Sequence, residues 1–372
     1  MRRDLLIYST LSSLVWASFA SQSVVTPLFA TELGATKRFV GWTISMASIA
    51  TILTAPLVAK YVRKKMVAVK YGFLIGVVGS ILLYMTRDFI HILYFRFIVG
   101  IAFGATIPLL IALASEINPE SRGSTMGVFN AISSFGWALG SLASGFIADV
   151  SNKYAFLFSC VLMSAGFALS HIAPEREVEI VVNIDRKTLK KLAPTYATFF
   201  FRHTCANGIW AFFPLFFVSV GATKSQVGFS YFLNMMVQAV TMGFVGRMTD
   251  KLGRKPVVRM GIIGTIFIFI GITLTTNIYL IYLLQAVLGF VWSCLFVGIT
   301  TLVADQSEWE TRGQAMAGFS MTRDATNIVG PILGGIIFYA TSFSRMIFIL
   351  LPLVFVAYGM TFLIHEKRSS EQ

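Results

Sequence analysis

Long apolar runs separated by short polar segments dominate the hydrophobic pattern of this chain. Runs of about 18 or more apolar residues with few charges are typical of membrane-spanning helices. At about 30 residues for a helix and its loop, the 372 residues can hold roughly twelve such helices. The pattern predicts spans at 5–30, 39–59, 66–86, 89–114, 123–148, 154–172, 191–219, 225–249, 257–276, 278–304, 313–340 and 344–364.

The composition agrees with this pattern and excludes several classes of protein. Hydrophobic residues make up 56% of the chain and charged residues only 13%, whereas soluble domains carry about 25% charged residues. A soluble enzyme, a disordered tail and a disulfide scaffold are therefore excluded. The three cysteines, Cys160, Cys205 and Cys294, are scattered through apolar runs and have no metal-site or disulfide spacing.

The net charge of +13 is explained by membrane topology. If both termini are cytoplasmic, the cytoplasmic loops and tails hold 21 of the 30 lysines and arginines, and the outer loops hold six. Such an excess on the cytoplasmic side fixes the orientation of membrane proteins. Three bases remain inside predicted spans: Arg96, Arg202 and Arg323.

The chain contains an internal repeat. The segment 27–37 matches 214–224 at an offset of 187, and 121–123 matches 311–313 at an offset of 190. The repeat predicts two six-helix halves, 1–172 and 191–372, joined by a cytoplasmic linker at 173–190. Two repeats of the same orientation are typical of a two-bundle transporter, whose site lies between the bundles.

Specific motifs carry a family resemblance. The loop 246–256 resembles the Gly-x-Leu-x-Asp-[Arg/Lys]-x-Gly-Arg-[Arg/Lys] signature of the major facilitator superfamily, and Arg96 with Gly100 and Gly104 is similar to that family's motif in span 4. With the repeat, the resemblance covers nearly the whole chain. It implies an all-α membrane fold of twelve helices in two pseudo-symmetric six-helix bundles, which works by alternating access.

Two departures from the family pattern affect the expected mechanism. The first copy of the loop signature, at 55–65, contains no aspartate, although in the family this residue helps to latch one half to a helix start in the other. We therefore expect a one-sided latch made by Asp250 and Arg254 near Arg122, the alternative being a solvated loop charge. In span 5, serines replace two residues of the Gly-Pro-x-x-Gly-Gly pattern of proton-coupled drug antiporters, which weakens that assignment.

Ionisable groups inside the spans are the candidates for proton coupling. Each costs about 2.5–3.5 kcal/mol on insertion scales, so each needs a partner or a water-filled cavity. The resemblance implies a role for Arg96 in proton movement or substrate binding, and the alternative is snorkelling to the interface. Asp324 is the only acid well inside a span, and it could carry a proton or form a structural pair. His203 titrates near neutral pH when unperturbed.

A polar and aromatic stripe in span 7 is the main candidate for substrate binding. His203, Asn207 and Trp210 follow one another at intervals of 4 and 3 residues, which places them on one face of a helix. The resemblance implies that spans 1, 4, 7 and 10 line the central cavity. The other candidates are Arg202 in span 7, Trp16 and Gln22 in span 1, and Gln285 and Trp292 in span 10. The alternatives are a hydrogen-bonded core histidine and hydrogen bonding between helices.

These features predict a secondary active transporter of small organic solutes that works by alternating access and is coupled to protons, with efflux favoured. The alternative is an uptake symporter or facilitator for an organic anion or sugar, followed by a non-transporting membrane receptor. Three arginines and one aspartate inside the spans suit an anionic or zwitterionic solute, or a neutral one that is hydrogen-bonded. ATP drive is not expected, because a phosphate-binding loop with a Lys-Ser/Thr end is missing.

The remaining expectations concern partners and location. We expect no catalytic residue, no cofactor, no metal site and no nucleic-acid partner. The expected partners are the small-molecule substrate, protons as the coupling ion and the lipid bilayer. The chain is expected to be a monomer in the cell (plasma) membrane, with multiple spans and both termini in the cytoplasm.

Overall fold

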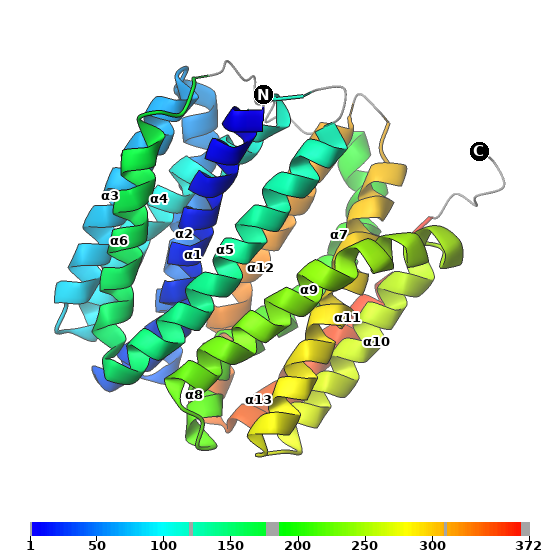
Figure 1. The fold of residues 1–372 in the computed structure, drawn as a ribbon. Helices are drawn as coiled ribbons and strands as arrows, with labels where there is room; N and C mark the ends of the chain where they lie inside the picture. Colours follow the sequence, from blue (N-terminus) through cyan, green and yellow to red (C-terminus); the bar gives the residue numbers. More distant parts are fainter. Residues whose placement is uncertain (1, 119–121, 176–185, 309–310, 366–372) are drawn as a thin grey trace. The chain divides into compact units, whose positions relative to one another are not determined.

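The structure, a computed structural model, describes residues 2–118, 122–175, 186–308 and 311–365. The described residues are almost entirely helical, with thirteen helices and no strand (Figure 1). By length and composition, nine of the helices in this part of the chain could cross a membrane. The chain is therefore an all-α membrane protein, which confirms the class that the hydrophobic pattern predicted.

The chain divides into two compact units, and the first comprises Met1–Ile180 and Pro214–Met235. Within it, α1 packs against α4, α5 and α6, and α3 packs against α4 and α6. Both α1 and α4 contact four other helices of this unit, so these two helices form its centre. The six helices from the N-terminus are α1 (Arg2–Glu32), α2 (Lys37–Tyr61), α3 (Lys65–Met85), α4 (Phe89–Ser115), α5 (Arg122–Val150) and α6 (Asn152–Ser170).

The second unit comprises Val181–Phe213 and Met236–Gln372. Here α7 packs against α12 and α13, and α10 packs against α11. Its helices are α7 (Arg186–Trp210), α10 (Arg254–Thr273), α11 (Ile278–Asp305), α12 (Arg312–Ala340) and α13 (Phe343–Met360).

Two helices run across the division between the units. The short α8 (Phe213–Ser219) and the long α9 (Lys224–Leu252) both begin on one side of a unit boundary and end on the other. The predicted halves, 1–172 and 191–372, follow the sequence repeat instead of this packing, and they stay a prediction.

The repeat seen in the sequence is also present in the backbone. Gly34 and Gly221 both have positive φ values, 91° and 97°. The residue after each glycine donates a backbone hydrogen bond five residues back, from Ala35 to Ala30 and from Ala222 to Phe217. This bond after a left-handed glycine ends a helix by satisfying its last carbonyls, and glycine adopts that conformation without a Cβ clash. The same turn is thus built twice, at the repeat offset of 187.

The span predicted at 191–219 is interrupted. The helix α7 ends at Trp210 and α8 begins at Phe213, with a turn between them in which Phe212 N–H donates to the Ile209 carbonyl. Pro214 has no N–H to donate to the Trp210 carbonyl four residues back, so one helical hydrogen bond is missing at this break. The matching Pro27 lies inside the uninterrupted α1, so the interruption belongs to the second repeat alone.

Candidate functional site

A buried polar network in the first unit surrounds Arg96 of α4. The guanidinium donates to Gln22 Oε1 on α1 at 2.8 Å. The amide nitrogen of Gln22 in turn donates to Ser159 on α6 at 2.8 Å and to Ser80 on α3 at 3.3 Å. A third hydroxyl, that of Ser18, lies 2.6 Å from that of Ser159. Four helices therefore meet at one glutamine, which was predicted to bind substrate.

The charge of Arg96 has no anionic partner in the described part of the chain. Arg96 is 2% exposed, its Nε has no hydrogen-bond partner, and none of the described ion pairs involves it. A neutral amide oxygen offsets only part of the cost of burying a cation. The Arg96 side chain does not snorkel to the interface. Its guanidinium points into the core of the first unit, where it donates to Gln22.

A second buried arginine, Arg202 of α7, lies in the second unit and is 1% exposed. Its Nε and Nη2 both donate to the hydroxyl of Thr265 on α10, at 3.0 and 2.8 Å. Its guanidinium also lies 5.4 Å from the centroid of the Trp292 ring on α11. A cation over an aromatic face is attracted by the ring quadrupole, most strongly for tryptophan. Arg202 therefore ties α7 to α10 and α11.

The neighbouring His203 stacks on the same tryptophan. The imidazole and indole centroids are 4.7 Å apart at an interplanar angle of 30°, and Phe199 lies 4.8 Å from the imidazole. The Nδ1 atom of His203 is buried and has no hydrogen-bond partner among the described residues. The aromatic group continues with Phe296, whose ring stacks on Trp292 at 5.5 Å. The structure thus brings together three of the predicted residues: Arg202, His203 and Trp292.

Asn207 shares the predicted stripe but contacts another helix. Its amide nitrogen donates to Asn327 Oδ1 at 2.7 Å and to the Thr326 hydroxyl at 3.1 Å, both on α12. The two helices approach closely beside it, since a Cβ on Gly330 would lie 2.7 Å from the Cβ of Asn207. Asn207 therefore takes part in the α7–α12 contact, where buried amides join helices within membranes.

The other predicted substrate residues make different contacts. Trp210 is partly exposed and stacks on Phe213 at 6.5 Å. Trp16 of α1 is also partly exposed and meets Phe19 edge to face at 5.8 Å. Gln285 of α11 is 1% exposed.

Asp324 of α12 is paired only loosely. Its carboxylate lies 3.9 Å from Nε of the adjacent Arg323, and both side chains are about one-third exposed. Exposed ion pairs with such geometry contribute roughly 0–1 kcal/mol. The Asp324 carboxylate is therefore held by no short ion pair in the described part of the chain.

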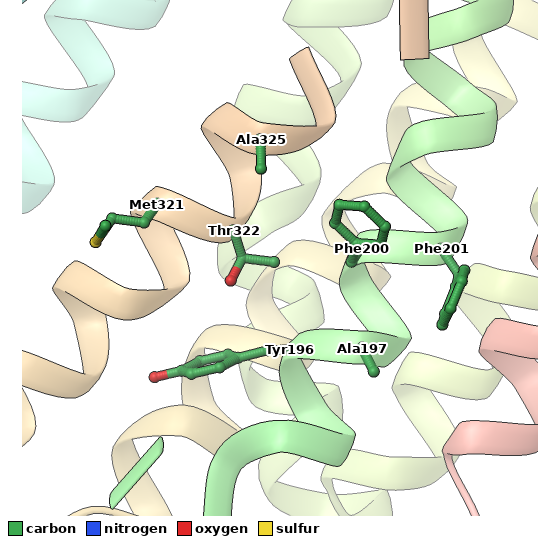
Figure 2. Close-up of a pocket in the computed structure, with 7 residues that line it drawn as sticks. All are labelled: Tyr196, Ala197, Phe200, Phe201, Met321, Thr322 and Ala325. Atoms are coloured by element: carbon green, nitrogen blue, oxygen red, sulfur yellow. The ribbon is translucent and has the colours of Figure 1, made fainter. Parts of the chain in front are cut away.

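A pocket of about 490 Å³ opens between α7 and α12, and none of the predicted site residues lines it. Figure 2 shows its walls: Tyr196, Ala197, Phe200, Phe201, Met321, Thr322 and Ala325. The surface is mostly aromatic and aliphatic, with few polar groups. The pocket is widely open, so it is a shallow apolar depression between the two helices, whereas small-molecule sites enclose most of their ligand.

Sequence reasoning missed this pocket, although one signal could have found it. Phe200 lies three residues before His203, and Tyr196 lies four residues before Phe200. Both therefore continue the predicted stripe by two turns towards the start of α7. Aromatic residues in an apolar span carry no polar signal, and their position on the stripe was the only indication.

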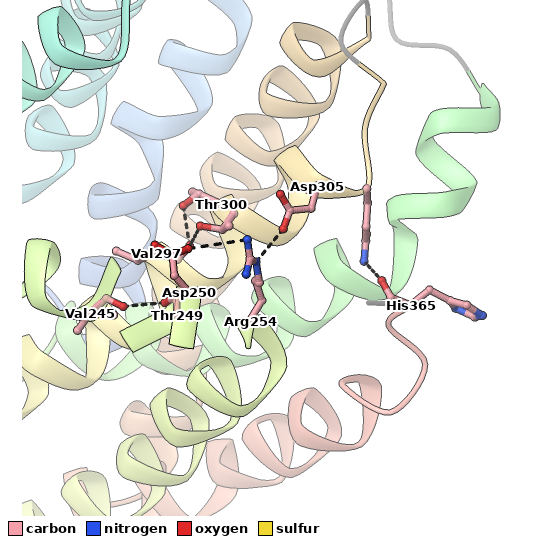
Figure 3. A network of polar contacts seen from close by, with 10 residues as sticks. Val245, Thr249, Asp250, Arg254, Val297, Thr300, Asp305 and His365 are labelled. Atoms are coloured by element: carbon pink, nitrogen blue, oxygen red, sulfur yellow. Dashed lines mark hydrogen bonds and ion pairs between the residues drawn. The ribbon is translucent and has the colours of Figure 1, made fainter. Parts of the chain in front are cut away.

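The loop signature forms a small ionic network at the ends of α9, α10 and α11 (Figure 3). Arg254 Nε lies 2.8 Å from Asp305 Oδ2, whereas Arg254 Nη2 lies 3.8 Å from Asp250 Oδ1. The Asp250 side chain is 72% exposed. Arg122, the third residue of the predicted latch, begins α5, but its side chain lies outside the described residues.

The features of a membrane transporter of the two-bundle class are present in the described residues: membrane-spanning helices in two compact units, a turn that recurs at the repeat offset, close glycine contacts and buried charges. The family model of the Major Facilitator Superfamily matches residues 8–201 and 195–372, and the chain belongs to this family.

Curated relatives include proteins named for drug resistance. Multidrug resistance protein 1 of Bacillus subtilis is 26% identical over 330 residues, with 84% of each chain covered. An uncharacterized MFS-type transporter of Methanocaldococcus jannaschii is 26% identical over 333 residues, covering 83% of this chain and 84% of the relative.

Solved structures share the fold at low identity. The nucleoside transporter NupG has a TM-score of 0.80 at 13% identity, covering 98% of this chain and 100% of its own. A bacterial homolog of the human lysosomal transporter Spinster, in an inward-facing conformation, has a TM-score of 0.79 at 13% identity, covering 98% and 96%. These likenesses confirm the predicted fold class. At such identity they carry no information on substrate.

Proposed function

We propose that this transporter is a proton-coupled secondary transporter that exports small organic solutes by alternating access. Family membership supports transport, and the multidrug resistance relatives support export. We further propose that it acts as a monomer in the cell membrane with both termini in the cytoplasm, for which the lysine and arginine asymmetry of the loops is the support.

The observation that carries the proposal is the cluster of Arg202, His203 and Trp292. The indole of Trp292 is partly exposed, and an aromatic group of this kind can bind a planar organic group at its edge or in place of a neighbouring ring. The imidazole of His203 stacks on this indole. Histidine is the one side chain that, when unperturbed, changes its charge near neutral pH. The Nδ1 of His203 is buried without a partner in the described part of the chain, so a proton or a solute group can satisfy it. One cluster therefore offers both a solute surface and a proton-binding atom.

We assign proton coupling to Arg96, His203 and Asp324. Asp324 is partly exposed and only loosely paired, so its carboxylate can take up and release a proton. Arg96 holds a buried positive charge against a neutral amide, and this charge favours a nearby carboxylate or anionic solute. Substrate contact is assigned to the residues predicted from the sequence: Trp16, Gln22, Arg202, His203, Asn207, Trp210, Gln285 and Trp292.

A second candidate function is uptake of an organic anion or sugar. It is favoured by two arginines, Arg96 and Arg202, that are buried without an ion pair among the described residues. Buried cations attract anionic solutes, and guanidinium groups also bind hydroxyl and carbonyl oxygens.

Transport by purified protein in liposomes with an imposed pH gradient tests these proposals. Separate pools of radiolabelled organic cations, anions and sugars would be followed in both directions. Export requires gradient-dependent movement of any of these pools towards the side that corresponds to the outer face. Accumulation of the anion or sugar pool on the opposite side would favour the second candidate. Absence of gradient-dependent flux for every pool would refute both.

Variants of His203 and Asp324 then test whether these residues couple transport to protons. Loss of gradient dependence in His203→Gln or Asp324→Asn, with downhill exchange retained, is expected for a coupling residue. The matched control is His171→Gln, because His171 is exposed at the end of α6 and its Nδ1 lies 2.9 Å from the Phe167 carbonyl oxygen. Full gradient dependence in both site variants would remove them from the coupling mechanism without affecting the transporter proposal.

A further inference from the structure

A carboxylate at the end of α5 holds the start of α9. Asp149 Oδ1 accepts hydrogen bonds from the backbone N–H groups of Lys224, at 2.8 Å, and Ser225, at 3.2 Å. The Lys224 ammonium donates in return to the carbonyl of Ala148 at 3.0 Å. All these residues belong to the first unit. Negative charge at a helix start and positive charge at a helix end are both favourable, so this contact complements two helix termini at once.

The start of α9 does not need Asp149 for its own cap. Thr223 and Gln226 form a capping box, in which each side chain accepts from the backbone N–H of the other, at 3.2 and 2.9 Å. This box leaves the N–H groups of the first two helical residues without an internal partner. Those two groups are the ones that Asp149 accepts from. The carboxylate therefore docks a helix that is already formed.

The backbones of α5 and α9 touch beside this carboxylate. A Cβ on Gly228 would lie 2.9 Å from the Cα of Gly145, and a Cβ on Gly145 would lie 2.7 Å from the Lys224 carbonyl oxygen. Ser141, Gly145 and Asp149 follow one another every four residues, so one face of α5 presents all three to α9. Small residues allow close contact without interlocking side chains. Such a contact can separate without repacking.

We infer that Asp149 is a positioning residue of the transport cycle, which holds α9 against α5 and releases it when the outer side opens. From Met236 onwards α9 belongs to the second unit, so a movement of that unit carries the start of this continuous helix. The inference rests on the proposed alternating access and on the predicted orientation. The second repeat has no matching carboxylate, because the residue at the repeat offset of 190 from Asp149 is Tyr339.

Distance measurement between two spin labels tests the inference without any substrate. The labels are attached to cysteines replacing Tyr154 of α6 and Tyr279 of α11, which are 45% and 81% exposed and lie one in each unit. In lipid nanodiscs, Asp149→Ala is expected to raise the ratio of long to short distances about tenfold, the effect of losing a hydrogen bond to a charged group. Asp149→Asn keeps an acceptor oxygen and is expected to give a smaller shift in the same direction.

Matched controls separate this contact from general effects of charge and packing. Glu32→Gln removes a carboxylate from a helix end of the first unit, where it accepts from Asn152 of α6 instead of α9, and is expected to leave the distances unchanged. Gly228→Ala forces a methyl group into the α5 contact and is expected to act like Asp149→Ala. Gly243→Ala, on the same helix in open space and outside the loop signature, is expected to have no effect.

An unchanged distance distribution in both Asp149 variants and in Gly228→Ala would overturn the inference, as would an equal shift in Glu32→Gln. Retention of a single peak in size-exclusion chromatography and of helical circular dichroism shows that a variant is folded. The outcome is independent of the proposed function: a shift in Asp149→Ala together with no flux of any solute would reject transport but keep the docking contact.

Discussion

The imidazole of His203 stacks on the indole of Trp292, with ring centroids 4.7 Å apart, although the two residues lie on different helices of the second unit. Arg202 lies over the same indole and is held by Thr265. Trp292 is therefore the common support of two side chains that the sequence placed in the site for their charge. Changes to this tryptophan should affect both.

We expect Trp292→Phe to weaken solute binding more than it lowers stability. The smaller ring keeps a surface for His203 but loses the strongest cation–π partner of Arg202, a contribution of about 1 kcal/mol. Transport should show a severalfold higher KM with a smaller change in the maximal rate, and thermal unfolding should shift by only a few degrees. Phe296→Leu, which removes a ring stacked on Trp292 but not on His203, is the comparison. An equal KM change in both variants would contradict a specific role of the tryptophan.

Arg96 and Gln22 give the second prediction. Gln22→Leu removes the only described acceptor of the Arg96 guanidinium and leaves a buried cation without a hydrogen bond. Unsatisfied buried polar groups cost about 1–3 kcal/mol, and more for charged groups. The melting temperature should therefore fall by several degrees, as followed by fluorescence in detergent.

Ser80→Ala is the matched control for Gln22→Leu. It removes a longer hydrogen bond of 3.3 Å to the same glutamine, and Ser159 still accepts from that amide nitrogen. Because Ser80 is buried and also lies 3.1 Å from the Ser159 hydroxyl, its loss should cost about 0.5–1.5 kcal/mol, which is less than the loss of the acceptor of a buried charge. A Gln22→Leu protein as stable as Ser80→Ala would mean that Arg96 finds another acceptor.

The extent to which the sequence predicted this molecule depends on the kind of signal. Apolar runs and repeated segments reflect local and symmetric constraints, so the all-α membrane class was predicted correctly, and the matched segments 27–37 and 214–224 contain the same turn at Gly34 and Gly221. The count of twelve spans stays a prediction, and the span at 191–219 is interrupted. Helix periodicity also placed His203 and Asn207 on one stripe. It could not tell that the first faces α11 and the second α12, because a helix face is wide enough to contact two neighbours.

Partners distant in the chain were beyond such reasoning. The acceptor of Arg96 lies 74 residues away, and nothing in the local pattern of span 4 or span 1 indicates this pairing. The wall of the pocket, including Phe200 and Met321, consists of residues that also suit a lipid-facing or core position. Their role follows only from the arrangement of α7 and α12.

The ionic network of the loop signature permits a third prediction. The Asp250 carboxylate is 72% exposed and 3.8 Å from Arg254, so the pair contributes close to nothing to stability. Asp250→Asn should leave the melting temperature unchanged. If the proposed latch exists, the same variant should shift the balance of labelling at single cysteines on the two faces of the membrane. Unaltered labelling on both faces would leave Asp250 as a solvated loop charge.

Asp305→Asn is the comparison for this network. Its carboxylate is closer to Arg254, at 2.8 Å, and less exposed, at 40%. Loss of this pair should lower stability by up to about 1 kcal/mol. Asp305→Asn could lower stability more than Asp250→Asn and also change the labelling more. That result would assign the function of the signature to the Arg254–Asp305 pair.

The glycine contact between α7 and α12 gives the last prediction. A Cβ on Gly330 would lie 2.7 Å from the Cβ of Asn207 and 2.8 Å from the Thr204 carbonyl oxygen, so Gly330→Ala must push the helices apart. Overpacking of this kind costs about 1–3 kcal/mol, and the displacement should also break the Asn207 bonds to α12 and raise the KM for solute. Gly243→Ala is the control, because a methyl group there meets no atom within 4 Å and alanine favours a helix over glycine by up to about 1 kcal/mol. Thermal unfolding should rank Gly330→Ala below the wild type and Gly243→Ala at or above it. The reverse order would mean that the α7–α12 contact is looser than the close approach of their backbones indicates.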